Sequence, residues 1–130
     1  DLKGQNLIIY FYPKDDTPGC TIEAKEFSES KNKFSKLNTK ILGISKDSTE
    51  KHKKFITKHS LTIDLVSDDV SVCEKFGVWV EKSMYGRKYM GIQRATFLCN
   101  EKGIITNVWE KVKIPGHADE VLAAVEKMNM

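Results

Sequence analysis

Cys20 is the residue in this chain with the clearest capacity for nucleophilic chemistry, because of the pattern around it. An apolar run over residues 7–12 predicts a buried strand that Pro13 ends, and a helical pattern begins at Cys20 or Thr21. Cys20 is therefore expected in the first turn of a helix. Unpaired backbone N–H groups and the positive end of the helix dipole favour a thiolate there, and the thiolate is the nucleophilic form of cysteine.

A helix terminus alone is too weak to hold an ordinary cysteine as a thiolate. An unperturbed thiol has a pKa near ~8.5, and lowering it to ~6 requires roughly 3.4 kcal/mol. A helix N-terminus typically supplies ~0.3–1 kcal/mol, so a cation must supply the rest. The chain contains two arginines, Arg87 and Arg94, and Arg94 begins a strand-like run over residues 94–99. Arg94 is therefore the predicted cation.

The spacing Pro13-x-x-x-Thr17-x-x-Cys20 resembles the peroxidatic motif of the peroxiredoxins. The fuller segment over residues 11–21, FYPKDDTPGCT, is similar to the bacterioferritin-comigratory (Q-type) branch of that AhpC/TSA family. Further similarity lies in GVW, EKSMYG and GIQRATFL, at residues 77–79, 81–86 and 91–98. The resemblance covers nearly the whole chain. A lone cysteine is more often a small buried core residue, but these surroundings favour a functional one.

The resemblance implies a thiol-dependent peroxidase that reduces hydrogen peroxide and organic hydroperoxides in antioxidant defence. Cys20 would attack one peroxide oxygen and become a sulfenic acid. Thr17, backbone N–H groups and Arg94 would stabilise the charge on the leaving oxygen, while Pro13 and Pro18 stiffen the loop and shield the thiol. Glu23, one turn after Cys20, either caps the helix start, holds the active-site loop, or is an exposed acid of the first turn.

The chain departs from the resemblance at the resolving cysteine. Many Q-type members have a cysteine five residues after the peroxidatic one, and Lys25 stands at that position. The resemblance therefore implies a one-Cys cycle, in which thioredoxin or a small thiol such as glutathione attacks the sulfenic acid. Cys73 and Cys99 lie in apolar settings and are expected to be buried packing residues. If the chain does resolve its own sulfenic acid, Cys73 is the preferred partner.

The elements that must position these residues follow from the apolar patterns. Strands are expected at residues 7–12, 40–45, 61–66, 94–99 and 104–112, and helices at 21–37, 47–59, around 70–76 and from 115–119 to the C-terminus. Residues 78–90 are expected to be irregular. Alternating strands and helices followed by a hairpin predict an α/β protein, with a mixed sheet and helices on both faces. This agrees with the thioredoxin-like fold that the resemblance implies.

Length and composition narrow the class of protein. With 130 residues the chain is expected to form one domain over 1–130, lacking the N-terminal hairpin that family members usually carry; a removed targeting segment is the alternative. The 21 basic and 18 acidic residues are dispersed, which argues against a nucleic-acid stripe. No apolar run reaches the ~18 residues of a membrane span. Three widely spaced cysteines indicate a reducing compartment, so a cytoplasmic location is expected. The chain is also expected to be a monomer.

Two other functions are compatible with the fold. A thiol–disulfide oxidoreductase needs a Cys-x-x-Cys pair, which the sequence lacks. The chain also lacks the Cys and His spacing of a metal site, so no metal or other cofactor is expected. A non-catalytic interaction module would keep the family's four site residues only by coincidence: Pro13, Thr17, Cys20 and Arg94. The sequence therefore favours the peroxidase.

Overall fold

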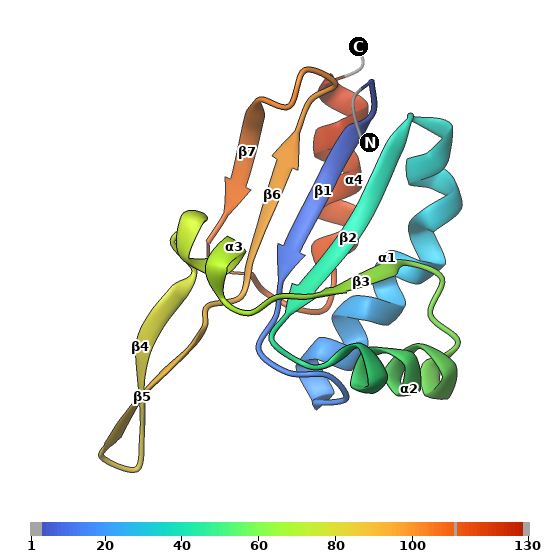
Figure 1. Cartoon of the computed structure of the whole chain (residues 1–130). Coiled ribbons are helices and arrows are strands. Elements are labelled where there is room, and N and C mark those ends of the chain that lie inside the picture. Colours follow the sequence, from blue (N-terminus) through green and yellow to red (C-terminus); the bar gives the residue numbers. More distant parts are fainter. Residues whose placement is uncertain (1–3, 111, 129–130) are drawn as a thin grey trace.

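A computed structural model describes residues 4–110 and 112–128 of the chain. The described residues form a five-stranded sheet, four helices and a separate two-stranded hairpin (Figure 1). The sheet contains β1 (Asn6–Phe11), β2 (Thr39–Ser45), β3 (Asp64–Ser67), β6 (Ala95–Cys99) and β7 (Ile105–Trp109). The helices are α1 (Pro18–Lys36), α2 (Thr49–His59), α3 (Ser71–Lys75) and α4 (His117–Met128). The hairpin pairs β4 (Trp79–Met84) with β5 (Arg87–Ile92).

The sheet is mixed, with strand order β3-β2-β1-β6-β7. β1 pairs in parallel with β2 and antiparallel with β6, and it is the central strand. In the β1–β6 register Phe11 lies opposite Ala95, so the end of β1 and the start of β6 share one edge of the sheet. This register brings the loop after β1 next to Arg94, which immediately precedes β6.

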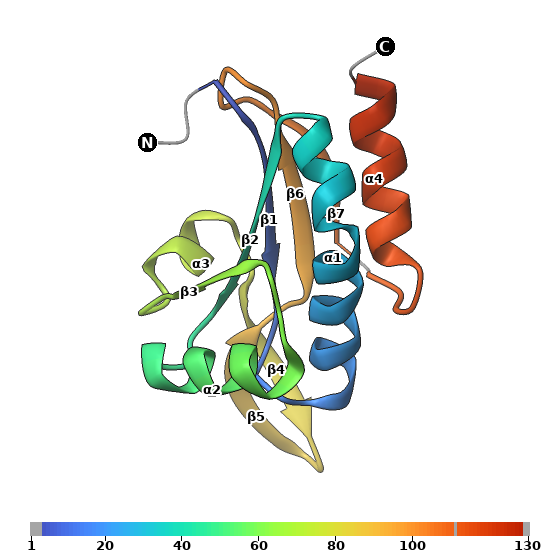
Figure 2. The same ribbon diagram turned by 90° about the vertical axis from the view of Figure 1, so that its right-hand side faces the viewer.

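Apolar residues on both faces of β1 build two separate parts of the core. Ile8 and Tyr10 pack with residues of α1 and α4 on one face of the sheet. Ile9 and Phe11 pack with Cys73 of α3 on the other face. Figure 2 shows α1 and α4 on one side of the sheet and α3 on the opposite side. The prediction of a mixed sheet with helices on both faces is therefore confirmed.

The predicted boundaries of α1, β3 and β7 differ from those in the structure. α1 begins at Pro18 rather than at Cys20 or Thr21, because proline fits the first helical position, where its fixed φ suits a helix and its missing N–H costs nothing. β3 begins at Asp64 rather than at residue 61. Leu61 and Ile63 precede the strand and pack in the part of the core that also contains residues of α1 and α4. β7 ends at Trp109, and part of the strand expected to 112 falls on Lys111, which lies outside the described residues.

The prediction that residues 78–90 are irregular is wrong. They form most of the β4–β5 hairpin, in which Met84 pairs with Arg87 across a two-residue turn. The turn residues Tyr85 and Gly86 have φ values of 53° and 79°. Positive φ at both central positions is the geometry that two-residue hairpins favour, so Gly86 was the available signal.

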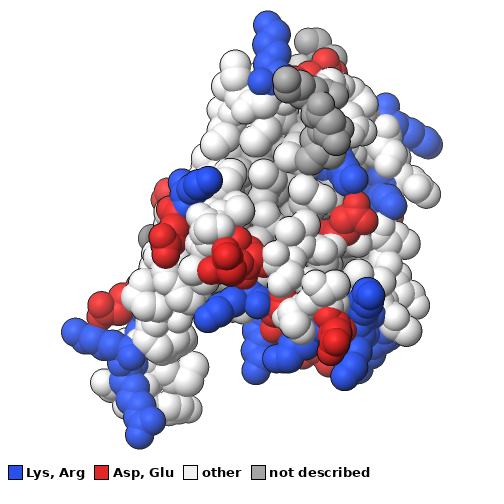
Figure 3. All heavy atoms as spheres, viewed as in Figure 1, with Lys and Arg blue, Asp and Glu red and all other residues white. Residues whose placement is uncertain are grey.

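Charged side chains are dispersed over the surface. In Figure 3 basic and acidic groups alternate over the visible face, and basic groups extend along the projecting hairpin. None of the described helices is long and apolar enough to cross a bilayer.

Candidate active site

Cys20 lies in the first turn of α1, directly after the loop that leaves β1. Thr17 is the N-cap residue, and its carbonyl oxygen accepts the first helical hydrogen bond, from the Thr21 N–H at 2.8 Å. Cys20 is the third residue of the helix and only 1% exposed. The sequence therefore placed Cys20 correctly at a helix N-terminus, although the helix starts earlier than predicted.

Arg94 is the cation at the Cys20 sulfur. Its Nη2 donates a hydrogen bond to Cys20 Sγ at 3.2 Å. A Cβ atom at Gly19 would lie 3.3 Å from the same Nη2, so a residue without a side chain leaves room for this approach. Burial opposes the charge on Arg94, but Glu23 and Cys20 outweigh it and raise the pKa of the guanidinium. A fully charged donor is thus held against the sulfur.

Glu23 is the residue that orients Arg94. Its Oε1 accepts a hydrogen bond from Arg94 Nη1 at 2.7 Å, and its side chain is 1% exposed. Burial raises the pKa of Glu23 to about 7, although Arg94 acts in the opposite direction. The expectation of an exposed first-turn acid is therefore wrong, and Glu23 binds the arginine rather than capping the helix. Its partner is 71 residues away in the chain, so local pattern gave no signal for the pair.

Thr17 and Pro13 frame the loop between β1 and α1. The Thr17 hydroxyl donates to the Lys14 carbonyl at 2.9 Å and makes no side-chain cap for the helix. Because its proton is used there, the hydroxyl oxygen is left to act as an acceptor. Pro13 is exposed at the start of the loop. The structure thus brings Cys20 and Arg94 into direct contact, with Thr17 one helical turn before the sulfur.

A buried polar cluster fixes this loop to α2, and the sequence gave no indication of it. Asp15 accepts hydrogen bonds from the Tyr12 hydroxyl at 2.6 Å and contacts His52 Nδ1 at 2.7 Å. The Asp15 backbone N–H donates to the Asp47 carboxylate at 2.8 Å. Burial disfavours the charged His52 ring, but the Asp15 carboxylate outweighs burial and raises the pKa of His52. The loop that precedes Cys20 is therefore held to α2 by the ion pair between Asp15 and His52.

The other two cysteines lie away from Cys20 and are chemically different. Cys73 belongs to the core on the opposite face of the sheet, where burial and a hydrogen bond with Asp68 raise its pKa to about 12. Cys99 pairs with Leu7, at the end of β1 far from the loop, and burial raises its pKa. Both are buried, as expected, and burial disfavours the thiolate form of each by raising its pKa.

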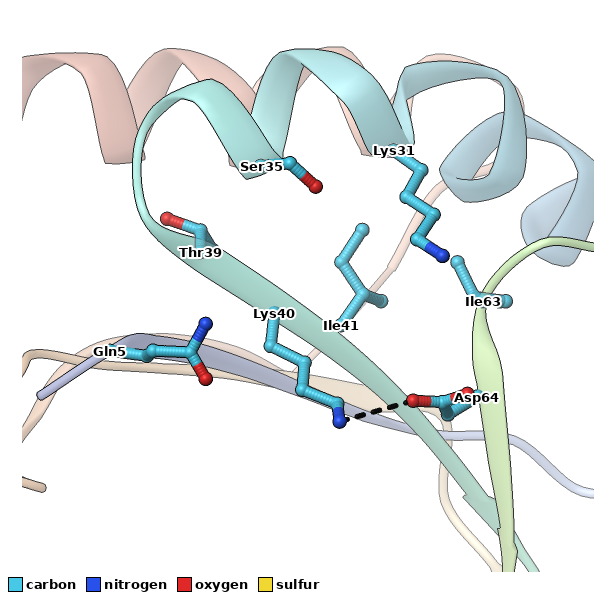
Figure 4. Close-up of a pocket in the computed structure, with 8 residues that line it drawn as sticks. All are labelled: Gln5, Lys31, Ser35, Thr39, Lys40, Ile41, Ile63 and Asp64. Carbon is cyan, nitrogen blue, oxygen red and sulfur yellow. Dashed lines mark ion pairs between the residues drawn. The ribbon is translucent and has the colours of Figure 1, made fainter. Parts of the chain in front are cut away.

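A pocket of about 280 Å³ lies at the opposite end of β2 from the active-site loop. Figure 4 shows its lining, which includes the start of β2, α1 and an ion pair between Lys40 Nζ and Asp64 at 3.2 Å. In the described part of the chain, no hydrogen bond or ion pair joins the residues that line it to Cys20 or Arg94. The candidate site is therefore the Cys20–Arg94–Glu23 group and not this cavity.

Comparison with known proteins supplies the family context. A model of the AhpC/TSA family matches residues 1–108. A putative peroxiredoxin bcp of Coxiella burnetii is 53% identical over 123 residues, covering 94% of this chain and 82% of the relative. Peroxiredoxin Bcp of Bacillus subtilis is 45% identical over 130 residues, covering 99% of this chain and 83% of the relative.

Solved structures agree with this relationship. A structure of the Xanthomonas campestris bacterioferritin comigratory protein, from a study of its alkyl peroxide reduction activity, is 45% identical with a TM-score of 0.94. The match covers 99% of this chain and 83% of that one. A PrxQ mutant from Xylella fastidiosa is 42% identical with a TM-score of 0.96, covering 100% of this chain and 81% of that one.

Proposed function

The chain belongs to the AhpC/TSA family as a Bcp-type peroxiredoxin, a thiol-dependent peroxidase, and from this premise we propose that Cys20 is its peroxidatic nucleophile. The observation that carries the proposal is the 3.2 Å contact between Arg94 Nη2 and Cys20 Sγ at a helix N-terminus. A guanidinium and a helix dipole together stabilise a thiolate there. Among the three cysteines, Cys73 and Cys99 have raised pKa values, and within residues 4–110 and 112–128 no cation forms a hydrogen bond to either sulfur.

The proposed chemistry is a displacement at oxygen. The Cys20 thiolate donates an electron pair to one oxygen of the hydroperoxide, and the O–O bond breaks. The sulfur becomes a sulfenic acid, and the distal oxygen leaves as water or an alcohol after taking a proton. Arg94 and the backbone N–H groups of the first turn stabilise the charge that develops on the leaving oxygen, and Thr17 Oγ1 accepts a hydrogen bond from the bound peroxide. Pro13 stiffens the loop and limits access of water.

We propose that regeneration is a one-Cys cycle. A thiol from outside the chain attacks the Cys20 sulfenic sulfur, releases water and leaves a mixed disulfide, which a second thiol reduces. Thioredoxin or a small thiol such as glutathione supplies these two steps. The position of Lys25, exposed on α1, and the burial of Cys73 and Cys99 support this cycle.

The substrates we propose are hydrogen peroxide and organic hydroperoxides. The relative from Xanthomonas campestris is described as reducing alkyl peroxides, which supports the second class. We further propose that the protein acts as a cytoplasmic monomer. Its three cysteines are free, which fits a reducing compartment.

Substitution of single cysteines tests the nucleophile. We expect Cys20→Ser to abolish peroxide consumption with thioredoxin or glutathione as reductant, while circular dichroism and the melting temperature show an intact fold. The matched controls Cys73→Ser and Cys99→Ser should keep the parent rate. Dimedone trapping after one equivalent of peroxide should label Cys20 in the parent chain. Turnover by the Cys20→Ser variant would overturn the assignment.

A further inference from the structure

Lys82 is a second basic residue beside the segment that carries Arg94. It belongs to β4, and side chains of a hairpin alternate between two faces. Lys88 of β5 lies on the other face of the hairpin, where it pairs with Glu81 at 3.6 Å. Lys82 shares its face with Gly91 of β5, and unlike Lys88 it is half-buried.

The side chain of Lys82 has a fixed course across the hairpin. Its stem lies over Gly91, because a Cβ atom at that position would be 3.2 Å from Lys82 Cδ and 3.5 Å from Cε. Its Nζ then donates a hydrogen bond to the carbonyl oxygen of Ile92. Ile92 is two residues before Arg94 in the same segment. The ammonium group is thus held next to the strand that delivers the arginine to Cys20.

The charge on Lys82 interacts with both members of the Cys20–Arg94 pair. Burial and the Arg94 guanidinium lower the pKa of Lys82, and the Cys20 sulfur acts in the opposite direction. Arg94 has an acidic partner, Glu23, whereas no carboxylate in the described ranges forms an ion pair with Lys82. Lys82 therefore brings a second positive charge to the segment of Arg94 that no carboxylate in the described ranges neutralises through an ion pair.

We propose that Lys82 is a positioning residue of the peroxidase site, a second fixed positive charge that acts with Arg94 to stabilise the Cys20 thiolate and the charge on the leaving oxygen. This inference rests on the proposed role of Cys20. It assigns the β4–β5 hairpin a function in the reaction, that of holding a cation at the site. A purely structural Lys82 would serve only as a hydrogen-bond donor to Ile92, a task that a neutral side chain can also perform.

The test separates charge from hydrogen bonding. Lys82→Gln keeps a donor without the charge, Lys82→Arg keeps the charge, and Lys88→Gln is the control on the other face of the hairpin. We expect the alkylation of Cys20 by iodoacetamide, followed by peptide mass spectrometry, to be about three- to tenfold slower at neutral pH for Lys82→Gln. Its pH profile should move to higher pH, and peroxide reduction should slow to a similar extent. Lys82→Arg and Lys88→Gln should match the parent chain.

A fourth variant changes no charge. Gly91→Ala crowds the Lys82 stem by a few tenths of an ångström and should slow alkylation in the same direction but to a smaller extent. Melting temperatures of all four variants show whether the hairpin stays folded.

Parent-like alkylation and turnover for a folded Lys82→Gln would overturn the inference, as would equal losses for Lys82→Gln and Lys82→Arg. Either result leaves the Cys20 assignment untouched, because that assignment depends on the Cys20→Ser variant.

Discussion

At the candidate site, Arg94 links the Cys20 sulfur to the Glu23 carboxyl group. Arg94 donates through Nη2 to Cys20 and through Nη1 to Glu23, so a single guanidinium bonds to a sulfur atom and to a carboxyl group. Glu23 fixes the plane of the arginine but also competes with the thiolate for its charge. The raised pKa of Glu23, about 7, shows that burial outweighs the ion pair. Glu23 therefore positions the Arg94 guanidinium, and below pH 7 its side chain is largely protonated and does not neutralise the positive charge of Arg94.

Arg94→Lys should slow peroxide reduction strongly. A lysine keeps a positive charge, but a single ammonium lacks the planar fork that bonds to sulfur and to Glu23 together. Losing one such donor typically costs ~10²–10³ in rate. Stopped-flow measurement of peroxide reduction and the alkylation rate of Cys20 at fixed pH give the two readouts. If both match the parent chain, the fork is not required and Arg94 acts only through its charge.

The parent chain should lose stability as pH rises because of Glu23, and the Glu23→Gln variant should lack this loss. A pKa raised from the ordinary 4.5 to about 7 means that the folded state holds a proton that the unfolded state has released. Protonated Glu23 therefore adds to the free energy of unfolding. This stabilisation is complete below pH 4.5 and is lost as pH rises through 7, and its size is roughly 3 kcal/mol at about 1.4 kcal/mol per pH unit. Urea unfolding between about pH 4.5 and pH 8 measures it. We expect the free energy of unfolding of the parent, relative to that of the variant, to fall over this range. If the two proteins show the same dependence of this free energy on pH, the raised pKa of Glu23 is contradicted.

The sequence predicted some of these residues for physical reasons and missed others for equally physical ones. Cys20 was found because a strand, a turn and a helix start leave a local pattern. Arg94 was found because arginine is scarce in the chain and a thiolate needs a cation. Glu23 was left open, because an acid in the first turns of a helix is usually exposed and its burial depends on an element 71 residues away.

Among the elements, the loop between β1 and α1 is the one whose position matters most. It is anchored at its middle by Asp15, which joins Tyr12 to His52 and through its N–H contacts Asp47. These contacts tie the loop to α2 and to the segment after β2. The loop therefore presents Thr17 and the first turn of α1 in one conformation.

His52→Gln should weaken this anchor in a pH-dependent way. The pKa of His52 is raised above its ordinary 6.5 because Asp15 outweighs burial. Its contribution to stability is therefore complete below pH 6.5 and is lost as pH rises through the folded-state pKa. Urea unfolding at about pH 5.5 and pH 8.5 should show a larger deficit for the variant at the lower pH. His59→Gln, on the exposed ion pair with Asp16, is the control, and an equal deficit at both pH values would show that the Asp15–His52 pair is not ionic.

The β4–β5 hairpin was the largest element missed from the sequence. Its strands carry charged and aromatic residues on both faces because both faces meet solvent over much of their length. A strand that is exposed on both sides lacks the apolar alternation by which strands are recognised. By contrast, the buried strands were predicted closely because their apolar runs are nearly continuous, and the amphipathic α4 was predicted because one of its faces is apolar.

At the scale of the whole molecule, the sheet separates the Cys20 thiol from the Cys73 thiol. Cys20 packs on the face covered by α1 and α4, Cys73 packs on the face covered by α3, and Cys99 lies at the far end of β6. The order of elements along the chain predicted the mixed sheet. It did not predict which face each cysteine occupies, because that depends on strand register.

Oxidation should therefore give no fast disulfide within one chain. A disulfide requires Cα atoms within ~7 Å, and a strand layer lies between Cys20 and Cys73. After one equivalent of peroxide, non-reducing peptide mapping should show Cys20 as a sulfenic acid, or as a mixed disulfide when a thiol is added. The Cys73→Ser variant is the control and should give the same map. A Cys20–Cys73 or Cys20–Cys99 bridge formed as fast as turnover would refute the one-Cys cycle.

The contact between Arg94 and Cys20 spans 74 positions of the chain, and this has a consequence for biosynthesis. The ribosome releases Cys20 long before Arg94, and the two meet only after β6 has docked antiparallel to β1. Until then the nascent chain carries the thiol without the guanidinium that accompanies it in the finished fold. An incomplete chain that ends before Arg94 therefore holds the Cys20 thiol without this hydrogen-bond partner, and the contact forms only once β6 has joined the sheet.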